Sequence, residues 1–189
     1  MKYLISILGI GLLFLSACSS ISVKHDYDSD YDFSTFKTYR WAGAEKINPD
    51  DELSKYPLAR KRFVIAIDKV MAEKGFTLLA GGDPDLVVLV HAGIKEKTSV
   101  HSTGGSYGYG HYGYGGWYQP GWGGYGGSTY VSQYEEGTIV IDFVSFENQE
   151  MAWRGSATGT IDDSQRTPEE LEEDTYEIAK KILDQYPPE

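Results

Sequence analysis

The pattern that most constrains the fold is the alternation in residues 85–97, DLVVLVHAGIKEK. Apolar side chains take every even position from Leu86 to Ile94, whereas the odd positions begin apolar and end polar. A period of two predicts a β-strand. Because the odd positions are apolar only at the beginning, we predict that both faces of the strand are buried there and that only one face is buried further along. We therefore expect residues 85–97 to form a central strand whose far end is exposed.

Two more strands are predicted over residues 137–146 and 150–161, because their apolar side chains both fall on odd positions. Residues that face each other across an antiparallel pair share a face, so the facing numbers must sum to an even number. This register favours an odd loop length, and we predict a three-residue loop over residues 148–150. It also places Asp142, Arg154 and Ser156 together on the outer face.

Shorter strands are predicted over residues 21–28 and 36–42, and two helices are marked by their ends. Pro57 suits the first position of a helix that Gly75 terminates. Thr167, Pro168 and Glu170 form a capping-box sequence at the start of the second helix. The chain is predicted to be an α+β domain, with an antiparallel or mixed sheet of about five strands and two helices packed on one face.

The core is expected between the sheet and the helices. The odd-numbered strand residues should pack against the apolar stripe of each helix. The predicted contacts join Ile139, Ile141, Phe143, Trp153 and Ile161 to Ile67, Val70, Ile178 and Ile182.

The N-terminus resembles a bacterial lipoprotein signal. An apolar run from Leu4 to Leu15 follows Lys2, and Leu15-Ser-Ala-Cys18 matches the lipobox pattern. We predict that residues 1–17 are removed, that Cys18 is lipidated, and that residues 18–25 form a short tether to a single domain over 26–189. Ser at position 19 is typical of sorting to the outer membrane, with the domain facing the periplasm.

Charge and cysteine content exclude several classes of function. The formal net charge is −11, which disfavours binding to the phosphates of nucleic acid. Cys18 is the only cysteine, so a mature domain would contain no disulfide, thiolate nucleophile or cysteine metal ligand beyond the anchor residue itself. No cofactor is predicted.

A glycine-rich tract over residues 104–127 interrupts the sheet pattern. It contains no aliphatic side chain, so it cannot form a core, and a connection of this length is usually functional or disordered. We predict an insertion whose aromatic side chains contact an envelope protein or a glycan; an inert low-complexity loop is the alternative. The candidate contact residues are Tyr107, Tyr109, Tyr112, Tyr114, Trp117 and Trp122.

The tract also matches two catalytic patterns by chance. Residues 108–113 fit G-x-G-x-x-G and residues 104–108 fit G-x-S-x-G. Both motifs require a turn from a strand directly into a helix, and more glycine follows here instead. Neither a dinucleotide site nor a serine hydrolase is predicted.

No metal site is predicted. His91, His101 and His111 lack the spacing of a helical zinc pair, and His91 is expected to cap the exposed face of its strand. The alternating aspartates between Asp26 and Asp32 begin like an EF-hand loop, but the glycine at its sixth position and the glutamate at its twelfth are missing. A solvated acidic segment is the preferred interpretation, and a weak calcium site is the alternative.

Several segments together resemble the bacterial lipoprotein family of domain of unknown function 4136. They are YDFSTFKTYRW, DPDLVVLVHAGIKEKT, EEGTIVIDFVS, WRGSATGTI and ILDQYPP. The resemblance covers nearly the whole mature chain and implies an envelope-anchored domain without a known activity. The recurring positions are interpreted as folding residues: Asp32, Phe33, Tyr39, Trp41, Asp85, Gly137, Trp153, Arg154 and Gly155.

The sequence thus favours a membrane-anchored lipoprotein that acts as a non-enzymatic binding or structural module of the envelope. The alternative is an envelope enzyme that acts on glycan through paired carboxylates. Two carboxylates within about 10 Å across a cleft, one of them buried, would favour the enzyme.

Overall fold

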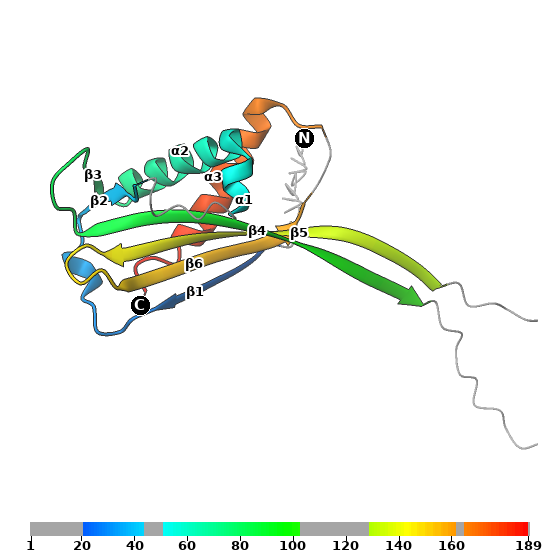
Figure 1. Ribbon diagram of the computed structural model, residues 1–189, viewed down its shortest axis with the longest axis horizontal. Helices are drawn as coiled ribbons and strands as arrows, with labels where there is room; N and C mark the ends of the chain where they lie inside the picture. Colours follow the sequence, from blue (N-terminus) through cyan, green and yellow to red (C-terminus); the bar gives the residue numbers. More distant parts are fainter. Residues whose placement is uncertain (1–20, 44–50, 103–128, 162–164, 189) are drawn as a thin grey trace, which may run out of the picture.

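The fold is a mixed sheet with helices on one face, seen in a computed structural model that describes residues 21–43, 51–102, 129–161 and 165–188 (Figure 1). Within these residues, six strands follow the order β1-β6-β5-β4-β2-β3. The strands are β1 (Ser22–Tyr27), β2 (Thr38–Trp41), β3 (Thr77–Leu78), β4 (Leu86–Ser102), β5 (Thr129–Ser145) and β6 (Met151–Thr160). The α-helices are α1 (Glu52–Lys55), α2 (Pro57–Glu73) and α3 (Pro168–Leu183), and a 3-10 turn, η1, spans Phe33–Thr35.

The predicted α+β architecture is confirmed. The adjacent strands β1, β6, β5 and β4 pair in antiparallel fashion. In contrast, β2 runs parallel to β4 and β3 runs parallel to β2, which makes the sheet mixed. The structure has one strand more than the expected five. The additional strand, β3, has only two residues, Thr77 and Leu78, and a pair of residues is too short to carry a recognisable alternation.

The hairpin of β5 and β6 has the predicted parity, but its loop is longer than predicted. Phe143 faces Trp153 and Asp142 faces Arg154, so the facing numbers sum to an even number along most of the ladder. The predicted loop over 148–150 is wrong: the strands are joined by residues 146–150, where Gln149 has a φ of 60°. The observed loop of five residues is also odd in length and satisfies the predicted parity, and a bulge between Phe143 and Val144 is a separate local shift of the register.

The helix ends follow the predicted sequence signals. Pro57 is the first residue of α2, and Gly75 lies beyond its end with a φ of 87°. The amide of Phe76 donates to the carbonyl of Met71 at 2.9 Å, which closes the helix in a Schellman motif. Both hydrogen bonds of the capping box between Thr167 and Glu170 are present at the start of α3. The short helix α1 was not predicted.

The core lies between the sheet and the helices α2 and α3. Phe143 and Trp153 pack with ring centroids 5.0 Å apart, and Tyr186, just beyond α3, packs edge-on against both. Six residues of the predicted core are at most 2% exposed: Ile67, Val70, Ile141, Phe143, Trp153 and Ile182. Ile139 and Ile178 are partly buried at its margin.

Two aspartates tie strands to their surroundings. Tyr39 and Trp41 of β2 both donate to Oδ1 of Asp68 on α2, at 2.7 Å and 2.9 Å. Asp85 accepts hydrogen bonds from the Lys37 and Thr38 amides and from the Thr38 hydroxyl. Burial acts to raise the pKa of Asp85, but these hydrogen bonds outweigh it and hold the pKa below its usual value.

The longest ladder joins β4 and β5, and it extends past the rest of the sheet (Figure 1). Its register is unbroken from the pair Leu86 and Ser145 to the pair Ser102 and Thr129. Both strands are longer than the sequence predicted. Their outer segments are polar and carry no apolar alternation, so the sequence pattern did not mark these segments as strands. The glycine-rich tract therefore connects the two ends of this hairpin, while the tract itself lies outside the described residues.

Candidate functional site

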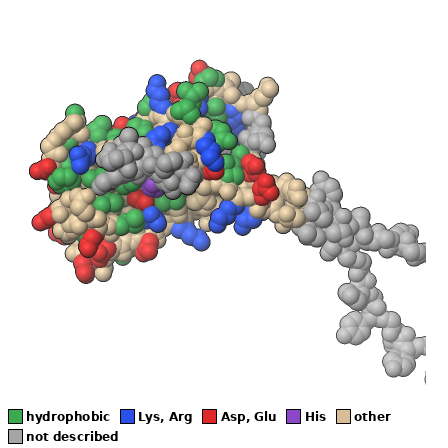
Figure 2. Space-filling model, in the orientation of Figure 1, with side chains coloured by type: hydrophobic (Ala, Val, Ile, Leu, Met, Phe, Trp, Pro, Cys, Tyr) green, Lys and Arg blue, Asp and Glu red, His purple; other side chains and the backbone are tan. Residues whose placement is uncertain are grey.

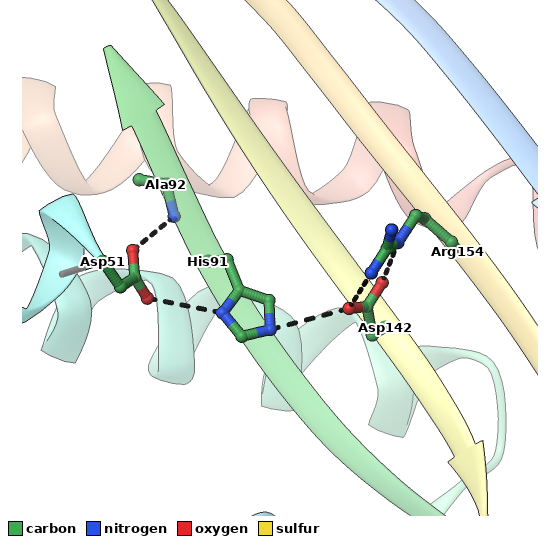
Figure 3. Close-up of polar contacts among 5 residues, drawn as sticks. All are labelled: Asp51, His91, Ala92, Asp142 and Arg154. Carbon is green, nitrogen blue, oxygen red and sulfur yellow. Dashed lines mark hydrogen bonds and ion pairs between the residues drawn. The ribbon is translucent and has the colours of Figure 1, made fainter. Parts of the chain in front are cut away.

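A chain of polar side chains crosses the face of the sheet that the helices leave uncovered (Figure 3). The two nitrogens of the His91 ring point in opposite directions, each toward an aspartate. Nδ1 lies 3.4 Å from Oδ2 of Asp51, and Nε2 lies 3.5 Å from Oδ2 of Asp142. Arg154 closes the chain with two hydrogen bonds to Asp142, of 2.6 Å and 2.7 Å.

Strand register and a helix cap position these four side chains. Asp142 and Arg154 are directly opposite on β5 and β6, as the sequence predicted, and His91 lies next to them on β4. Asp51 is the N-cap of α1: its Oδ1 accepts from the amide of Leu53 at 3.1 Å and from that of Ala92 at 2.8 Å. Asp51 thus joins α1 to β4.

Both carboxylates are buried, which makes their partners energetically important. The side chains of Asp51 and Asp142 are 3% and 4% exposed, whereas those of His91 and Arg154 are 29% and 49% exposed. The hydrogen bonds to Asp142 raise the pKa of the Arg154 guanidinium and keep it charged. Oδ2 of Asp51 has no hydrogen-bond partner among the described residues, and it faces only the His91 ring.

This arrangement does not favour the paired-carboxylate enzyme. Asp51 and Asp142 are close and buried, but the imidazole ring of His91 lies between them. Each ring nitrogen of His91 faces a carboxylate, so neither is directed at a side chain that could act as a nucleophile. This row of polar side chains is suited to holding α1, β4, β5 and β6 in place.

A second feature is an apolar groove of about 370 Å³ between the sheet and the first turns of the helical layer. Its floor consists of two rows of cross-strand neighbours, Ala92–Ile139–Ala157 and Ile94–Gly137–Gly159. Small floor residues leave the space open. The walls and rim include Ile21, Leu53, Tyr56, Phe63, Ile161 and Ile178.

The third feature is a projecting arm, which we define as residues 96–102 of β4 paired with residues 129–135 of β5. Among the described residues, pairing with β6 ends at Glu136 and pairing with β2 ends at Val88, so both edges of the arm lack a neighbouring strand. At about 3.3 Å per residue the arm is roughly 23 Å long. Figure 2 shows it leaving the body of the domain, with charged side chains of both signs near its base.

None of the predicted site residues lies within the part of the chain that the structure describes. Cys18 and the aromatic residues Tyr107, Tyr109, Tyr112, Tyr114, Trp117 and Trp122 lie outside the described residues, as does His111. His101 lies on β4, at the outer end of the arm. No helix in the described part of the chain is long and apolar enough to cross a membrane.

The acidic segment before β2 is used for local structure. Asp28 accepts a hydrogen bond from the Asp30 amide, and Asp32 caps η1 by accepting from Ser34. Within the residues that the structure describes, no group of three or more His, Cys, Asp or Glu side chains is arranged to hold a metal ion.

Sequence reasoning missed Asp51 and the groove. Asp51 precedes a four-residue helix that no periodicity marks, although an aspartate followed by Glu52 and Leu53 is a weak N-cap signal. The groove has no local signal, since its lining comes from segments far apart in the chain.

Known proteins show the fold but not the activity. A PDZ domain protein from Parabacteroides distasonis matches with a TM-score of 0.53 and 16% identity; the match covers 89% of this chain and 36% of that one, so this chain spans about a third of that protein. A PelC dodecamer from Paraburkholderia phytofirmans matches with a TM-score of 0.40 and 10% identity, over 86% of this chain and 94% of that one. No curated protein matches this chain in sequence. A family model described as "Domain of unknown function (DUF4136)" matches residues 23–188.

Proposed function

The chain belongs to the family of domain of unknown function 4136, and from that premise we propose that it is a lipid-anchored, non-enzymatic binding domain of the cell envelope. Its contacts are made through the arm and the aromatic tract that the arm carries. The anchor is Cys18 in the outer membrane, with the domain facing the periplasm.

The projecting arm is the observation that carries this proposal. A two-stranded ribbon is at best marginally stable in water by itself, because one ladder of hydrogen bonds does not offset the loss of chain entropy. The described arm side chains are polar or partly exposed, and Lys97 and Glu136 form an ion pair of 3.4 Å across its base. Such a ribbon contributes little to the core, and a contact with a partner accounts for its length.

The composition of the tract adds to this argument. Residues 103–128 join the last described pair of the arm, Ser102 and Thr129. Half of residues 104–127 are glycine, and the remainder is rich in tyrosine and tryptophan, which offer large amphipathic surfaces to a protein or a glycan. The net charge of −11 makes nucleic acid an unfavourable partner.

The polar chain around His91 supports a binding domain over an enzyme. Its histidine and its arginine are both committed to buried carboxylates, which is a structural use of these groups. No cofactor is required for binding of this kind.

Photo-crosslinking in intact cells tests the proposal. A photoreactive residue is placed at Tyr134, which is 38% exposed on the arm, and in a matched control at Leu78, which is 46% exposed on β3. We expect a discrete adduct from position 134 only, with its mass identifying a protein or a glycan. The same adduct should disappear when the six aromatic residues of the tract are changed to Ser.

Two results would contradict the proposal. Equal adducts from both positions, or an adduct at position 134 that survives the aromatic changes, would leave the tract as an inert loop. The anchor is tested separately: Cys18→Ala should abolish lipid modification, measured by mass spectrometry, and move the protein out of the membrane fraction.

A further inference from the structure

The apolar groove is separate from the arm. We propose that it shelters one acyl chain of the lipid that the chain itself carries on Cys18, whenever that acyl chain is outside a bilayer. This inference rests on the proposed function, because it requires Cys18 to be lipidated.

The chemistry of the groove selects an uncharged, elongated apolar ligand. Its volume of about 370 Å³ falls within the range of pockets that hold small molecules, roughly 300–1,000 Å³. Among its described lining residues the only charged side chain is Glu52, which forms an ion pair with Lys55. A free fatty acid would bring a second carboxylate close to Glu52 without a lining cation to neutralise it. An acyl chain in ester or amide linkage has no such charge.

The floor of the groove depends on the absence of side chains. A Cβ atom built on Gly137 would lie 3.1 Å from Ile161, and one built on Gly159 would lie 3.3 Å from Ile21. Both contacts are tighter than ordinary packing, so any larger residue at either position would narrow the groove. The two glycines face each other in the register of β5 and β6.

The position of the N-terminal segment favours the protein's own lipid as the ligand of the groove. Ile21 lines the groove, and its side chain is the neighbour that a Cβ on Gly159 would meet. Cys18 is three residues earlier, and three extended residues span at most roughly 10 Å. An acyl chain on Cys18 therefore begins within reach of the rim and has a high effective concentration there, which a lipid from solution does not have.

Energetics explains why sheltering and membrane anchoring can alternate. Each methylene gains free energy on leaving water, whether it enters a bilayer or an apolar groove. Transfer of the acyl chain from water into the groove is therefore strongly favourable, whereas transfer from a bilayer into the groove gains little free energy. The acyl chain is thus expected in the groove in aqueous solution and in the membrane when a membrane is present.

The experiment uses the purified, lipidated full chain with p-benzoylphenylalanine in place of Tyr56, which lines the groove and is 55% exposed. The matched control carries it in place of Leu58, which is 68% exposed and does not line the groove. After illumination in detergent-free buffer, mass spectrometry locates the adducts. We expect a bond between position 56 and the acyl chain on Cys18, absent at position 58, and severalfold weaker after insertion into phosphatidylethanolamine vesicles.

Further arms separate the alternatives. Mixing ¹⁵N-labelled and unlabelled protein distinguishes adducts within one chain from those between two copies, and mixed-isotope adducts would overturn the inference. Ile94→Glu adds a charge at a floor position that is 37% exposed, and it should abolish the adduct without unfolding the domain. A lipidated Cys18 without any adduct at position 56 refutes the groove proposal alone. An unmodified Cys18 refutes the proposed anchor and the groove proposal together.

Discussion

The inner and outer halves of the β4–β5 hairpin have the same backbone pairing and opposite surroundings. In the inner half, Leu86, Val88 and Val90 are at most 2% exposed beneath the helices. In the outer half, Lys95, Glu96 and Lys97 are exposed and no third strand lies alongside within the described residues. The β4–β5 ladder is continuous, so the halves differ in side-chain burial and in their flanking strands, since β2 and β6 pair only with the inner half. Backbone pairing between β4 and β5 determines the shape of the hairpin, whereas the buried side chains of the inner half provide most of its stability.

The largest difference between the halves should appear when one aromatic residue is removed from each half of β5. Phe143→Ala deletes a fully buried ring and should cost about 3–5 kcal/mol, or roughly 6–20 °C in Tm for a domain of this size. Tyr134→Ala, on the arm, should stay within about 0.5 kcal/mol. Thermal unfolding of both variants measures this. Similar losses at the two positions would show that the arm contributes to the cooperative core.

The outer face of the inner half is tested through Arg154. Arg154→Ala leaves Asp142 buried without its main partner and should cost about 2–3 kcal/mol, less than a fully buried pair because the arginine is half-exposed. Adding Asp142→Asn removes the stranded charge and should recover part of the loss. Urea unfolding of the two single variants and the double variant gives the coupling. Strict additivity would refute the interaction.

The acid stability of the inner half should depend on Asp85. Its pKa is below the usual value in the folded protein, so its contribution to stability is complete above the unfolded pKa of about 3.9 and is lost as the pH falls through the lower folded pKa. Asp85→Asn should therefore cost about 1 kcal/mol at pH 7 and much less near pH 2. Urea midpoints across this range test the sign, and a cost that grows in acid would contradict it.

No loss of stability is expected from a change at the end of the outer half. Replacing residues 104–127 by Asn-Gly shortens the connection, and each halving of loop length favours closure by about 0.6 kcal/mol, so a gain of at most about 2 kcal/mol is expected. Partner crosslinking at Tyr134 should be lost in the same variant. Collapse of the fold on deletion, measured by circular dichroism, would show that the tract packs into the domain.

The sequence predicted the inner half better than the outer half for a physical reason. Burial imposes alternation, so Leu86 to Ile94 and the parity that pairs Asp142 with Arg154 could be recognised from one chain. The outer strands are exposed and bear no such constraint, so their extension to Ser102 and from Thr129 could not be predicted. The loop over 146–150 was missed because loops of three and of five residues both make the facing numbers sum to an even number, so parity does not choose between them.

The candidate site was less predictable than the fold. Asp142 and Arg154 followed from register, but Asp51 comes from a distant segment and reaches Ala92 only after α1 has folded against β4. The groove combines residues from β4, β5, β6 and the helices with Ile21 at the rim. Features assembled from several segments leave no trace in any one of them.

The unpaired edges of the arm also bear on how this domain can diversify. Side chains alternate with a period of two along a strand, so adding two residues to each strand of the arm preserves every facing pair and lengthens it by roughly 6.6 Å. Because no third strand has to be extended in step, such a change leaves the inner sheet untouched. The length of the arm can thus change in steps of two residues per strand without affecting the buried contacts that keep the domain folded.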